Sequence, residues 1–266
     1  MCGKVSVWSG VLERERARAG VGVILSEKMK NCMIDYACIS ERILWVRLKI
    51  KLQRVVVGVA YAPCDAEPSE KKDEFWDELN IVLGQFNPRE KVIVAGDLNA
   101  RVGTKSETSE NVLGRFNDPS VNGNGERLIE VCIENGLYIS NTFFKHKYIH
   151  TYTWENRTAG QKSVIDFIIY DQRLKSLVMD TRVVRGADVG TDHYLIISHI
   201  KLNLGWRKRV KKRAHAVSRV KVERLYEQRE LYSELLDERL SKQIECGNYL
   251  ELKWECFKEC VVTTAK

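Results

Sequence analysis

The chain has 266 residues, 44% of them hydrophobic, which is enough for a folded domain of about 200 residues or more around one core. This composition excludes a disordered or collagen-like chain. The formal net charge is +7, but eight basic residues and no acidic residue fall within 206–221. The rest of the chain is close to neutral, so composition alone does not identify it as a nucleic-acid-binding protein.

The first half of the chain carries both strand and helix patterns. Residues 20–25 (GVGVIL) and 43–51 predict half-buried strands, and the β-branched run 54–61 (RVVVGVAY) predicts a strand covered on both faces. In 69–86 the apolar residues recur every three or four positions, which predicts an amphipathic helix. The apolar run 91–95 (KVIVA) predicts a further buried strand.

In the second half a helix is predicted at 124–135, with Gly136 ending it. Further strands are predicted at 137–140, 151–154, 164–170, 179–184 and 194–202. Strands outnumber helices, and only the two helical segments are long enough to be crossover helices. The pattern therefore indicates an α/β fold with a sizeable mixed sheet or sandwich flanked by helices.

The composition changes after Leu202, which divides the chain into a domain at 1–203 and a tail at 204–266. Residues 207–213 hold six basic residues in seven, and 225–244 carries leucine, isoleucine and tyrosine at helical spacing. The basic run is a nuclear-localisation signal, a contact to a phosphate backbone or a solvated linker. The helix packs on the sheet edge, or it mediates contact with a protein partner or self-association.

Cysteine usage and hydropathy bear on location. The eight cysteines show no paired CxxC spacing, and the five histidines do not cluster with them. We therefore expect reduced, mostly buried thiols and no structural zinc site. No apolar run approaches the roughly 20 residues that a membrane span requires, and the N-terminus has no secretory apolar region. The expected protein is soluble and intracellular, without a membrane partner.

Polar residues follow two of the predicted strands. Asp97 and Asn99, in Gly96-Asp97-Leu98-Asn99, stand where a buried strand ends, a common place for catalytic side chains. Asp97 could orient or deprotonate a water molecule, and the uncharged Asn99 could donate to a phosphate oxygen. The alternative is a simple turn, which Asp and Asn favour for local reasons. Tyr61 offers a phenol at another strand end.

Two further carboxylates are candidates. Asp166 lies within the apolar run 164–169, where a buried carboxylate needs a histidine, a metal or several donors as partners. A structural hydrogen bond is the alternative there. Asp192 directly precedes His193, and such a pair can fix the imidazole tautomer or hold a metal. An ordinary surface loop is the alternative for this pair.

Four motifs resemble, in this order, those of the endonuclease/exonuclease/phosphatase superfamily: Tyr61-Ala62-Pro63, Gly96-Asp97-Leu98-Asn99, Ser163-Val164-Ile165-Asp166 and Thr191-Asp192-His193. More closely, residues 18–204 resemble the endonuclease domain of non-LTR retrotransposon polyproteins and the craniofacial development protein 2-like proteins that derive from such elements. The resemblance implies a DNase I-like four-layer αββα sandwich with a divalent-metal site for Mg²⁺ or Mn²⁺. It also implies DNA as the substrate class and partner, and with the basic run a nuclear location.

The resemblance implies a role for each motif residue. Asp97 would orient or activate the attacking water, Asn99 would stabilise the pentacovalent phosphate, and Tyr61 would hydrogen-bond near the phosphate or the leaving group. His193 would contact the scissile phosphate. Asp166 would polarise His193 there. The roles agree with the chemistry, because a phosphodiester gains negative charge towards the transition state.

Three further residues take roles from the resemblance. Asp192 would contribute to the metal site. Thr153 and Trp154 resemble the family's Thr-Trp element near the DNA contact surface, where they would bind substrate. Without the resemblance, Trp154 would pack against a nucleotide or fill the core, and core packing is the commoner role of a single tryptophan.

The sequence departs from the family at its start. The family begins with two further strands, which bring an Asn and a metal-binding Glu, ahead of the segment equivalent to Gly20; here 19 residues precede it. Glu13 and Glu15 lie in a charged run (LERERAR) without a strand pattern, and neither is assigned as the ligand. We therefore expect a sandwich without its first strands. Two functions follow: Mg²⁺-dependent hydrolysis of DNA with weakened activity, or a catalytically inactive, truncated nuclease-fold module that binds or is vestigial.

Overall fold

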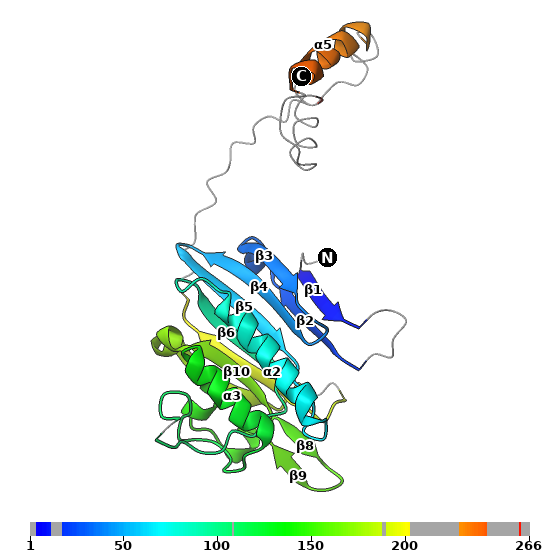
Figure 1. Cartoon of the computed structure of the whole chain (residues 1–266). Coiled ribbons are helices and arrows are strands. Elements are labelled where there is room, and N and C mark those ends of the chain that lie inside the picture. Colours follow the sequence, from blue (N-terminus) through cyan, green and yellow to red (C-terminus); the bar gives the residue numbers. More distant parts are fainter. Residues whose placement is uncertain are drawn as a thin grey trace. The chain divides into compact units, whose positions relative to one another are not determined.

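The computed structural model describes residues 4–11, 18–107, 109–187, 190–202, 229–243 and 261. The chain divides into two compact units, Met1–Gly205 and Trp206–Lys266. The first unit contains the sheets and most of the helices (Figure 1). In the described part of the chain, no helix combines the length and the apolar character needed to cross a membrane.

A six-stranded sheet forms the centre of the first unit, with the strand order β3-β4-β5-β6-β10-β7. The strands are β3 (Met33–Cys38), β4 (Ile43–Ile50), β5 (Gln53–Ala60), β6 (Lys91–Asp97), β7 (Leu137–Ile139) and β10 (Asp166–Asp171). Neighbouring strands are antiparallel except β5 and β6, which are parallel. Parallel strands need a long crossover, and the helix α2 (Ser69–Gly84) supplies it.

Two helices cover one face of this sheet, α2 and α3 (Gly123–Glu134) (Figure 1). Phe75, Trp76 and Leu79 of α2 are buried in one core cluster with Leu128 and Cys132 of α3. These are the apolar positions that predicted both helices, and the predicted bounds differ from the observed ones by at most two residues. The amphipathic patterns are therefore confirmed.

Two hairpins lie on the other face of the sheet: β1 (Val5–Gly10) with β2 (Gly20–Leu25), and β11 (Val178–Val184) with β12 (Leu195–Ile200). Val7, Val21 and Val23 of the first hairpin pack in one cluster with Leu44 and Val55 of the sheet. The central strands are thus covered on both faces, as their β-branched sequences predicted. β11 and β12 pack beside η1 (Ser140–Phe143) and β10.

Shorter elements complete the unit. The strands β8 (Trp154–Asn156) and β9 (Gln161–Ser163) form a small hairpin. The remaining helical turns are α1 (Glu27–Lys30), η2 (Tyr148–His150) and η3 (Gln172–Leu177). Among the described residues no helix covers the outer side of the β1-β2 hairpin, where Trp8 and Ile24 are exposed.

Some sequence expectations need correction. The strand predicted at 164–170 begins at Asp166, so this carboxylate stands at a strand end and not inside the strand. The strand predicted at 151–154 begins only at Trp154. β1 was not predicted, because its six residues alternate weakly and precede a strongly charged run. Glu13 and Glu15 of that run lie outside the described residues.

In the second unit the structure describes α5 (Arg229–Gln243). It falls within the helical pattern predicted at 225–244. Leu231 and Leu235 are exposed on this helix. The basic run 207–213 lies outside the described residues.

Candidate active site

The site lies at one end of the central sheet, where three strand ends meet. Tyr61 directly follows β5, Asp97 is the last residue of β6, and Asp166 is the first residue of β10. Because β6 and β10 are antiparallel, Asp97 and Asp166 are register partners. The backbone N–H of Ala62 donates to the Asp97 carbonyl at 2.9 Å, which joins the end of β5 to the end of β6. Sheet geometry therefore brings together carboxylates that are far apart in the sequence.

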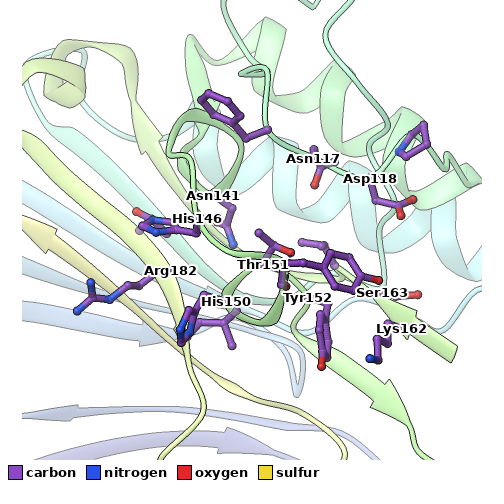
Figure 2. Close-up of a pocket in the computed structure, with 16 residues that line it drawn as sticks. Asn117, Asp118, Asn141, His146, His150, Thr151, Tyr152, Lys162, Ser163 and Arg182 are labelled. Carbon is purple, nitrogen blue, oxygen red and sulfur yellow. Dashed lines mark hydrogen bonds between the residues drawn. The ribbon is translucent and has the colours of Figure 1, made fainter. Parts of the chain in front are cut away.

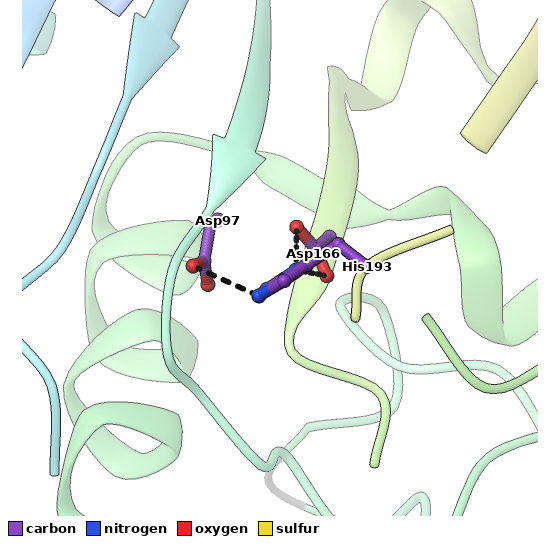
Figure 3. A group of neighbouring side chains, drawn as sticks. All are labelled: Asp97, Asp166 and His193. Carbon is purple, nitrogen blue, oxygen red and sulfur yellow. Dashed lines mark hydrogen bonds and ion pairs between the residues drawn. The ribbon is translucent and has the colours of Figure 1, made fainter. Parts of the chain in front are cut away.

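His193 completes a three-residue cluster with these two carboxylates (Figure 3). Its Nδ1 lies 3.1 and 3.2 Å from the two carboxylate oxygens of Asp166. Its Nε2 lies 4.0 Å from Oδ2 of Asp97. The imidazole is thus placed between the two acids, with one ring nitrogen facing each of them. A ring oriented by a carboxylate on Nδ1 presents Nε2 for chemistry.

Asp97 is in an unfavourable position for a negative charge. Burial raises the pKa of Asp97 to about 6, and the neighbouring Asp166 adds to the rise. The backbone N–H of Asn99 donates to Oδ1 of Asp97 at 3.0 Å and, together with His193, opposes the rise. A carboxyl whose pKa is raised by burial and by a second acid ionises more readily when a positive charge lies close to it.

The pKa of His193 is raised, chiefly because its ring bonds the Asp166 carboxylate, and Asp97 and Asp192 act in the same direction. Burial opposes this rise. The protonated imidazole is therefore favoured over a wider pH range than for a free histidine. A cationic donor beside two acids suits contact with a phosphate oxygen.

Asn99 has a left-handed backbone, with φ of 45°. The alternation of the strand does not continue through it, so strand geometry does not place the Asp97 and Asn99 side chains on one side. Its Nδ2 donates to the Ala62 carbonyl at 3.0 Å, and its backbone N–H closes a turn onto Asp97. The turn that the sequence analysis gave as the alternative is therefore present at Asn99, and its part in catalysis stays a prediction.

Tyr61 lies near Asp97. Burial raises the pKa of the Tyr61 phenol, and the charge of Asp97 contributes to the rise. The Arg42 guanidinium stacks over the ring at 5.2 Å and donates to the Tyr61 carbonyl at 3.1 Å. The phenol therefore stays protonated near neutral pH and can act as a hydrogen-bond donor.

Thr153 and Trp154 form hydrogen bonds with the segments that carry Asp166 and Asp192. Thr153 is fully buried, and its Oγ1 accepts the backbone N–H groups of Ile165 and Asp166 at 3.0 and 3.1 Å. Trp154 Nε1 donates to Oδ2 of Asp192 at 2.7 Å. This bond is the main reason why the pKa of Asp192 is lowered. Trp154 is half-buried and is not a core residue.

Asp192 lies outside the cluster of three ligand groups that the described residues form, Asp97, Asp166 and His193. It acts on that cluster through its charge, because it shifts the pKa values of both Asp97 and His193. Its backbone carbonyl accepts the N–H of Glu155 at 3.0 Å, and its carboxylate bonds Trp154. Its part as a metal ligand stays a prediction.

Two supporting asparagines were missed in the sequence. Asn141 accepts the Ile168 N–H at 3.0 Å and donates to the Asp166 carbonyl at 3.2 Å, where β7 no longer pairs with β10. Asn124 is fully buried and donates to the carbonyls of Pro63 and Asn99 at 2.9 and 3.2 Å. Both lie outside the recognised motifs: Asn124 begins the helix predicted at 124–135, and Asn141 directly follows the strand predicted at 137–140.

The loop before His193 has an anchor that was also missed. The guanidinium of Arg185 lies 3.7 Å from the ring centroids of both Tyr152 and Tyr194. The Tyr194 hydroxyl donates to Glu155 at 2.5 Å, and its backbone N–H donates to the Thr153 carbonyl at 2.7 Å. These contacts fix the residue next to His193 on both its side chain and its backbone.

The residues present fit a divalent cation. Oxygen ligands and a concentration of negative charge favour Mg²⁺ or Mn²⁺, and Mg²⁺ commonly uses one or two carboxylates together with substrate phosphates. Asp97 and Asp166 offer such oxygens within a group whose ligand atoms all lie within 4.8 Å of one another. A cation held by these oxygens would favour the ionised form of Asp97, whose pKa burial and Asp166 raise.

Comparison with known proteins matches this sequence to a family model and to a relative. A family model described as endonuclease-reverse transcriptase matches residues 55–197. Craniofacial development protein 2 of Bos taurus is 34% identical over 188 residues, which are 70% of this chain and 31% of that protein. The chain thus spans about a third of the length of this relative.

Solved structures show the fold. The endonuclease domain of TRAS1, a telomere-specific non-LTR retrotransposon, aligns with a TM-score of 0.54 at 17% identity, over 75% of this chain and 81% of that one. The 3′ phosphatase NExo from Neisseria, bound to a product DNA hairpin, aligns with a TM-score of 0.53 at 17% identity, over 75% and 80%. The chain has the DNase I-like α/β fold that these structures share.

Proposed function

The chain belongs to the endonuclease-reverse transcriptase family, and from this premise we propose that its domain at 1–203 is a metal-dependent phosphodiesterase acting on DNA. The observation that carries the proposal is the line of groups Asp166, His193 and Asp97, with His193 Nδ1 on Asp166 and Nε2 facing Asp97. The site combines a cationic donor with carboxylates at an open strand end. That combination suits a phosphodiester, whose charge grows during hydrolysis.

Each residue has a part in this proposal. Asp166 holds the imidazole of His193 protonated, and His193 donates to a non-bridging oxygen of the scissile phosphate. Asp97 orients the attacking water. Asn99 and Tyr61 add uncharged donors, which do not repel the substrate as further acids would. These roles follow the motif resemblance, and the contacts of His193 with Asp166 and Asp97 support them.

A divalent ion would be held by Asp97 and Asp166, with Asp192 nearby, and would supply charge stabilisation for the phosphate. The same ion would remove the repulsion between the two acids. The resemblance favours Mg²⁺ or Mn²⁺. DNA as substrate is supported by the family and by the DNA-bound solved structure. A nuclear location is supported by the basic run 207–213.

Nicking of supercoiled plasmid by the purified chain in Mg²⁺ tests the proposal. We expect nicking that EDTA abolishes and that His193→Ala lowers by about 100-fold or more, because general acid-base and charge contacts contribute that much. His199→Ala is the matched control, since His199 is exposed on β12 and outside the cluster. It should nick like the wild type.

The alternative function is a catalytically inactive module that binds DNA. A folded chain that binds DNA but does not nick it in Mg²⁺ or Mn²⁺ would contradict the enzymatic proposal and support this alternative. Nicking that persists in His193→Ala would point to a contaminating nuclease. Asp192 lies outside the cluster of Asp97, Asp166 and His193, so the cluster in the described residues holds only two carboxylates. This small number of carboxylates is the observation that favours the inactive module.

A further inference from the structure

Arg185 directly follows β11, and its guanidinium lies in the angle between two tyrosine rings. The guanidinium carbon is 3.7 Å from the ring centroid of Tyr152 and 3.7 Å from that of Tyr194. Tyr194 is the residue after His193. We propose that Arg185 is a positioning residue for His193, which holds the imidazole in place through Tyr194. The inference rests on the proposed function, because it concerns the same histidine.

The guanidinium of Arg185 also holds groups beyond the two rings. Its Nε donates to the Ile149 carbonyl, and its Nη1 lies 3.7 Å from Oε2 of Glu155. The same carboxylate oxygen accepts the Tyr194 hydroxyl at 2.5 Å. The side chains of Arg185 and Glu155 are 21% and 18% exposed, so water and salt screen their attraction less than at an open surface. Tyr194 is thus held at its ring by the arginine and at its hydroxyl by the glutamate.

Tyr152 gives this arrangement a fixed side. Its ring is buried, and the Lys162 ammonium lies 4.7 Å from the ring centroid (Figure 2). The rings of Tyr152 and Tyr194 meet edge to face, with centroids 5.8 Å apart and planes at 83°. Arg185 fills the angle between them and contacts both. The arginine therefore ties Tyr194 to a buried part of the domain.

The backbone carries this constraint from Tyr194 to His193. Residues 192–194 pair with residues 153–155 through two backbone hydrogen bonds, of 3.0 and 2.7 Å. His193 stands between these bonds, opposite Trp154 in an antiparallel bridge. A pairing of two hydrogen bonds is marginal by itself in water. The side-chain contacts of Tyr194 therefore contribute to the place of the whole segment.

The contact that depends on this placement is the one between His193 and Asp166. Nδ1 of the imidazole lies 3.1 and 3.2 Å from the two carboxylate oxygens. Asp166 is held from its own side by Thr153, whose Oγ1 accepts the Asp166 N–H at 3.1 Å. Without Arg185, one partner of the contact stays fixed and the other is free to shift. A misplacement of about 1 Å in a reacting group can lower a rate by about 100-fold.

Arg185 acts on the site from outside it. Among the described residues, its contacts go to the two tyrosines, to Glu155 and to a backbone carbonyl, and none goes to the three-residue cluster. Several partners at once require the rigid fork of N–H donors that arginine has and lysine lacks. Arg185→Lys therefore keeps the charge and removes the anchor.

The test follows the imidazole itself, in EDTA, and does not depend on hydrolysis. In protein labelled with ¹⁵N-histidine, the Nδ1 proton that His193 donates to a carboxylate should give a downfield NMR line, which His193→Ala identifies by its loss. We expect Arg185→Lys to speed the exchange of this proton with water by about 10-fold or more, because the arginine's contacts with both rings are lost.

Arg47→Lys is the matched control. Arg47 lies over the Trp45 ring at 4.7 Å and 2.6 Å from the Asp35 carboxylate, so it too combines an aromatic contact with an ion pair. It belongs to β4, which β5 separates from β6. Arg47→Lys should lose comparable contacts and leave the His193 line unchanged.

Tyr194→Leu tests the same anchor from its other side. It removes the ring and leaves Arg185 in place, and it should speed proton exchange as Arg185→Lys does. The double variant should be no worse than either single variant, since both break one chain of contacts. Additive effects of the two changes would contradict a shared route. This variant also keeps the test valid if Arg185→Lys melts too early to be measured.

Kinetics separate positioning from DNA contact. If the chain nicks plasmid, Arg185→Lys should lower kcat by about 10-fold and leave KM unchanged, because a misplaced His193 loses an interaction made in the transition state. A raised KM with an unchanged kcat would overturn the inference and assign Arg185 to contact with DNA.

The NMR outcomes keep this inference apart from the proposed function. Wild-type exchange in Arg185→Lys would overturn the inference whether or not the chain nicks plasmid. Absence of the downfield line from the wild type would overturn it too, because there would be no fixed imidazole to position. Faster exchange in Arg185→Lys, in a chain that does not nick, would keep the positioning role and contradict the enzymatic proposal.

Discussion

Asp97 is a residue at which folding and the proposed function have opposite requirements. Its carboxylate is desolvated and faces Asp166, and both effects raise its pKa to about 6 from 3.8. Folding therefore disfavours the ionised form, which is the form needed to bind a cation or to orient a water molecule. Such a cost is expected where a side chain is positioned for chemistry.

The first prediction is that Asp97→Asn stabilises the chain in EDTA. Because the folded pKa is raised, the wild type loses stability as the pH rises from about 4 to about 6, and the loss is complete above that range. The amide removes the charge and keeps the Oδ1 that accepts the Asn99 N–H. We expect a gain of about 1–3 kcal/mol at pH 7.5 and little gain at pH 4, since one pKa unit corresponds to about 1.4 kcal/mol.

Thermal or urea melts of both proteins across this pH range measure the effect. Added Mg²⁺ should stabilise the wild type and should narrow its difference from Asp97→Asn. An equal difference between the two proteins at pH 4 and pH 7.5 would contradict the electrostatic account.

At residue scale the sequence identified the catalytic candidates but not their surroundings. Asp97, Asp166 and His193 were recognisable because their motifs are short, local and ordered. Asn124 and Asn141 were not, because their partners are backbone groups of distant segments. The left-handed backbone of Asn99 was also hidden, since a single sequence does not show which Asn leaves the strand.

At the scale of elements, the start of β10 depends on one buried hydroxyl. Thr153 Oγ1 accepts two consecutive N–H groups, those of Ile165 and Asp166. The Thr153 backbone also links the segments of Ser163 and Tyr194. Its N–H donates to the Ser163 carbonyl, and its carbonyl accepts the N–H of Tyr194. The position of Asp166 therefore depends on a segment that contributes no group to the cluster.

The second prediction is that Thr153→Val destabilises the fold by about 2 kcal/mol or more, because two N–H groups lose their acceptor while the side-chain shape is kept. Thr153→Ser retains the hydroxyl and should cost only about 1 kcal/mol, for the lost methyl group. Chemical denaturation measures both. A smaller cost for valine than for serine would show that methyl packing matters more than the two hydrogen bonds.

The elements that the sequence predicted well are those with one clear period. The strand at 20–25, the apolar runs 54–61 and 91–95 and the two helices were placed to within about two residues. β1, β3 and β9 were missed, because short strands with exposed residues lack a clear alternation. The starts of β8 and β10 were misplaced because Thr153 and Val164 are strand-like in type but lie in the connection between strands.

At the scale of the whole molecule, charge is distributed unevenly along the sequence. Residues 1–203 are not strongly basic, while 207–213 carries six basic residues in seven. If both parts of the chain contact DNA, the first contributes specific geometry and the second contributes a charge-dependent affinity. Salt dependence separates the two contributions.

The third prediction concerns this salt dependence. The double variant Lys211→Gln with Lys212→Gln should bind DNA with a weaker salt dependence. The slope of log affinity against log salt should become less steep by about 1–2, because each lost phosphate contact reduces the steepness by about one. Lys30→Gln with Lys71→Gln removes the same charge from exposed positions of the folded domain and should leave the slope unchanged. Equal slopes for the wild type and the 211/212 variant would exclude the basic run from DNA contact.

The position of β10 has a consequence for how the chain folds. β10 lies between β6 and β7, although it follows both in the sequence. While the chain is synthesised from its N-terminus, β6 must present an open edge until residues 166–171 arrive, and pairing over such a separation is slow. Asp97 therefore acquires its partner carboxylate only when the sheet closes. The candidate active site should be one of the last features to form, and folding intermediates should expose an edge that is prone to aggregate.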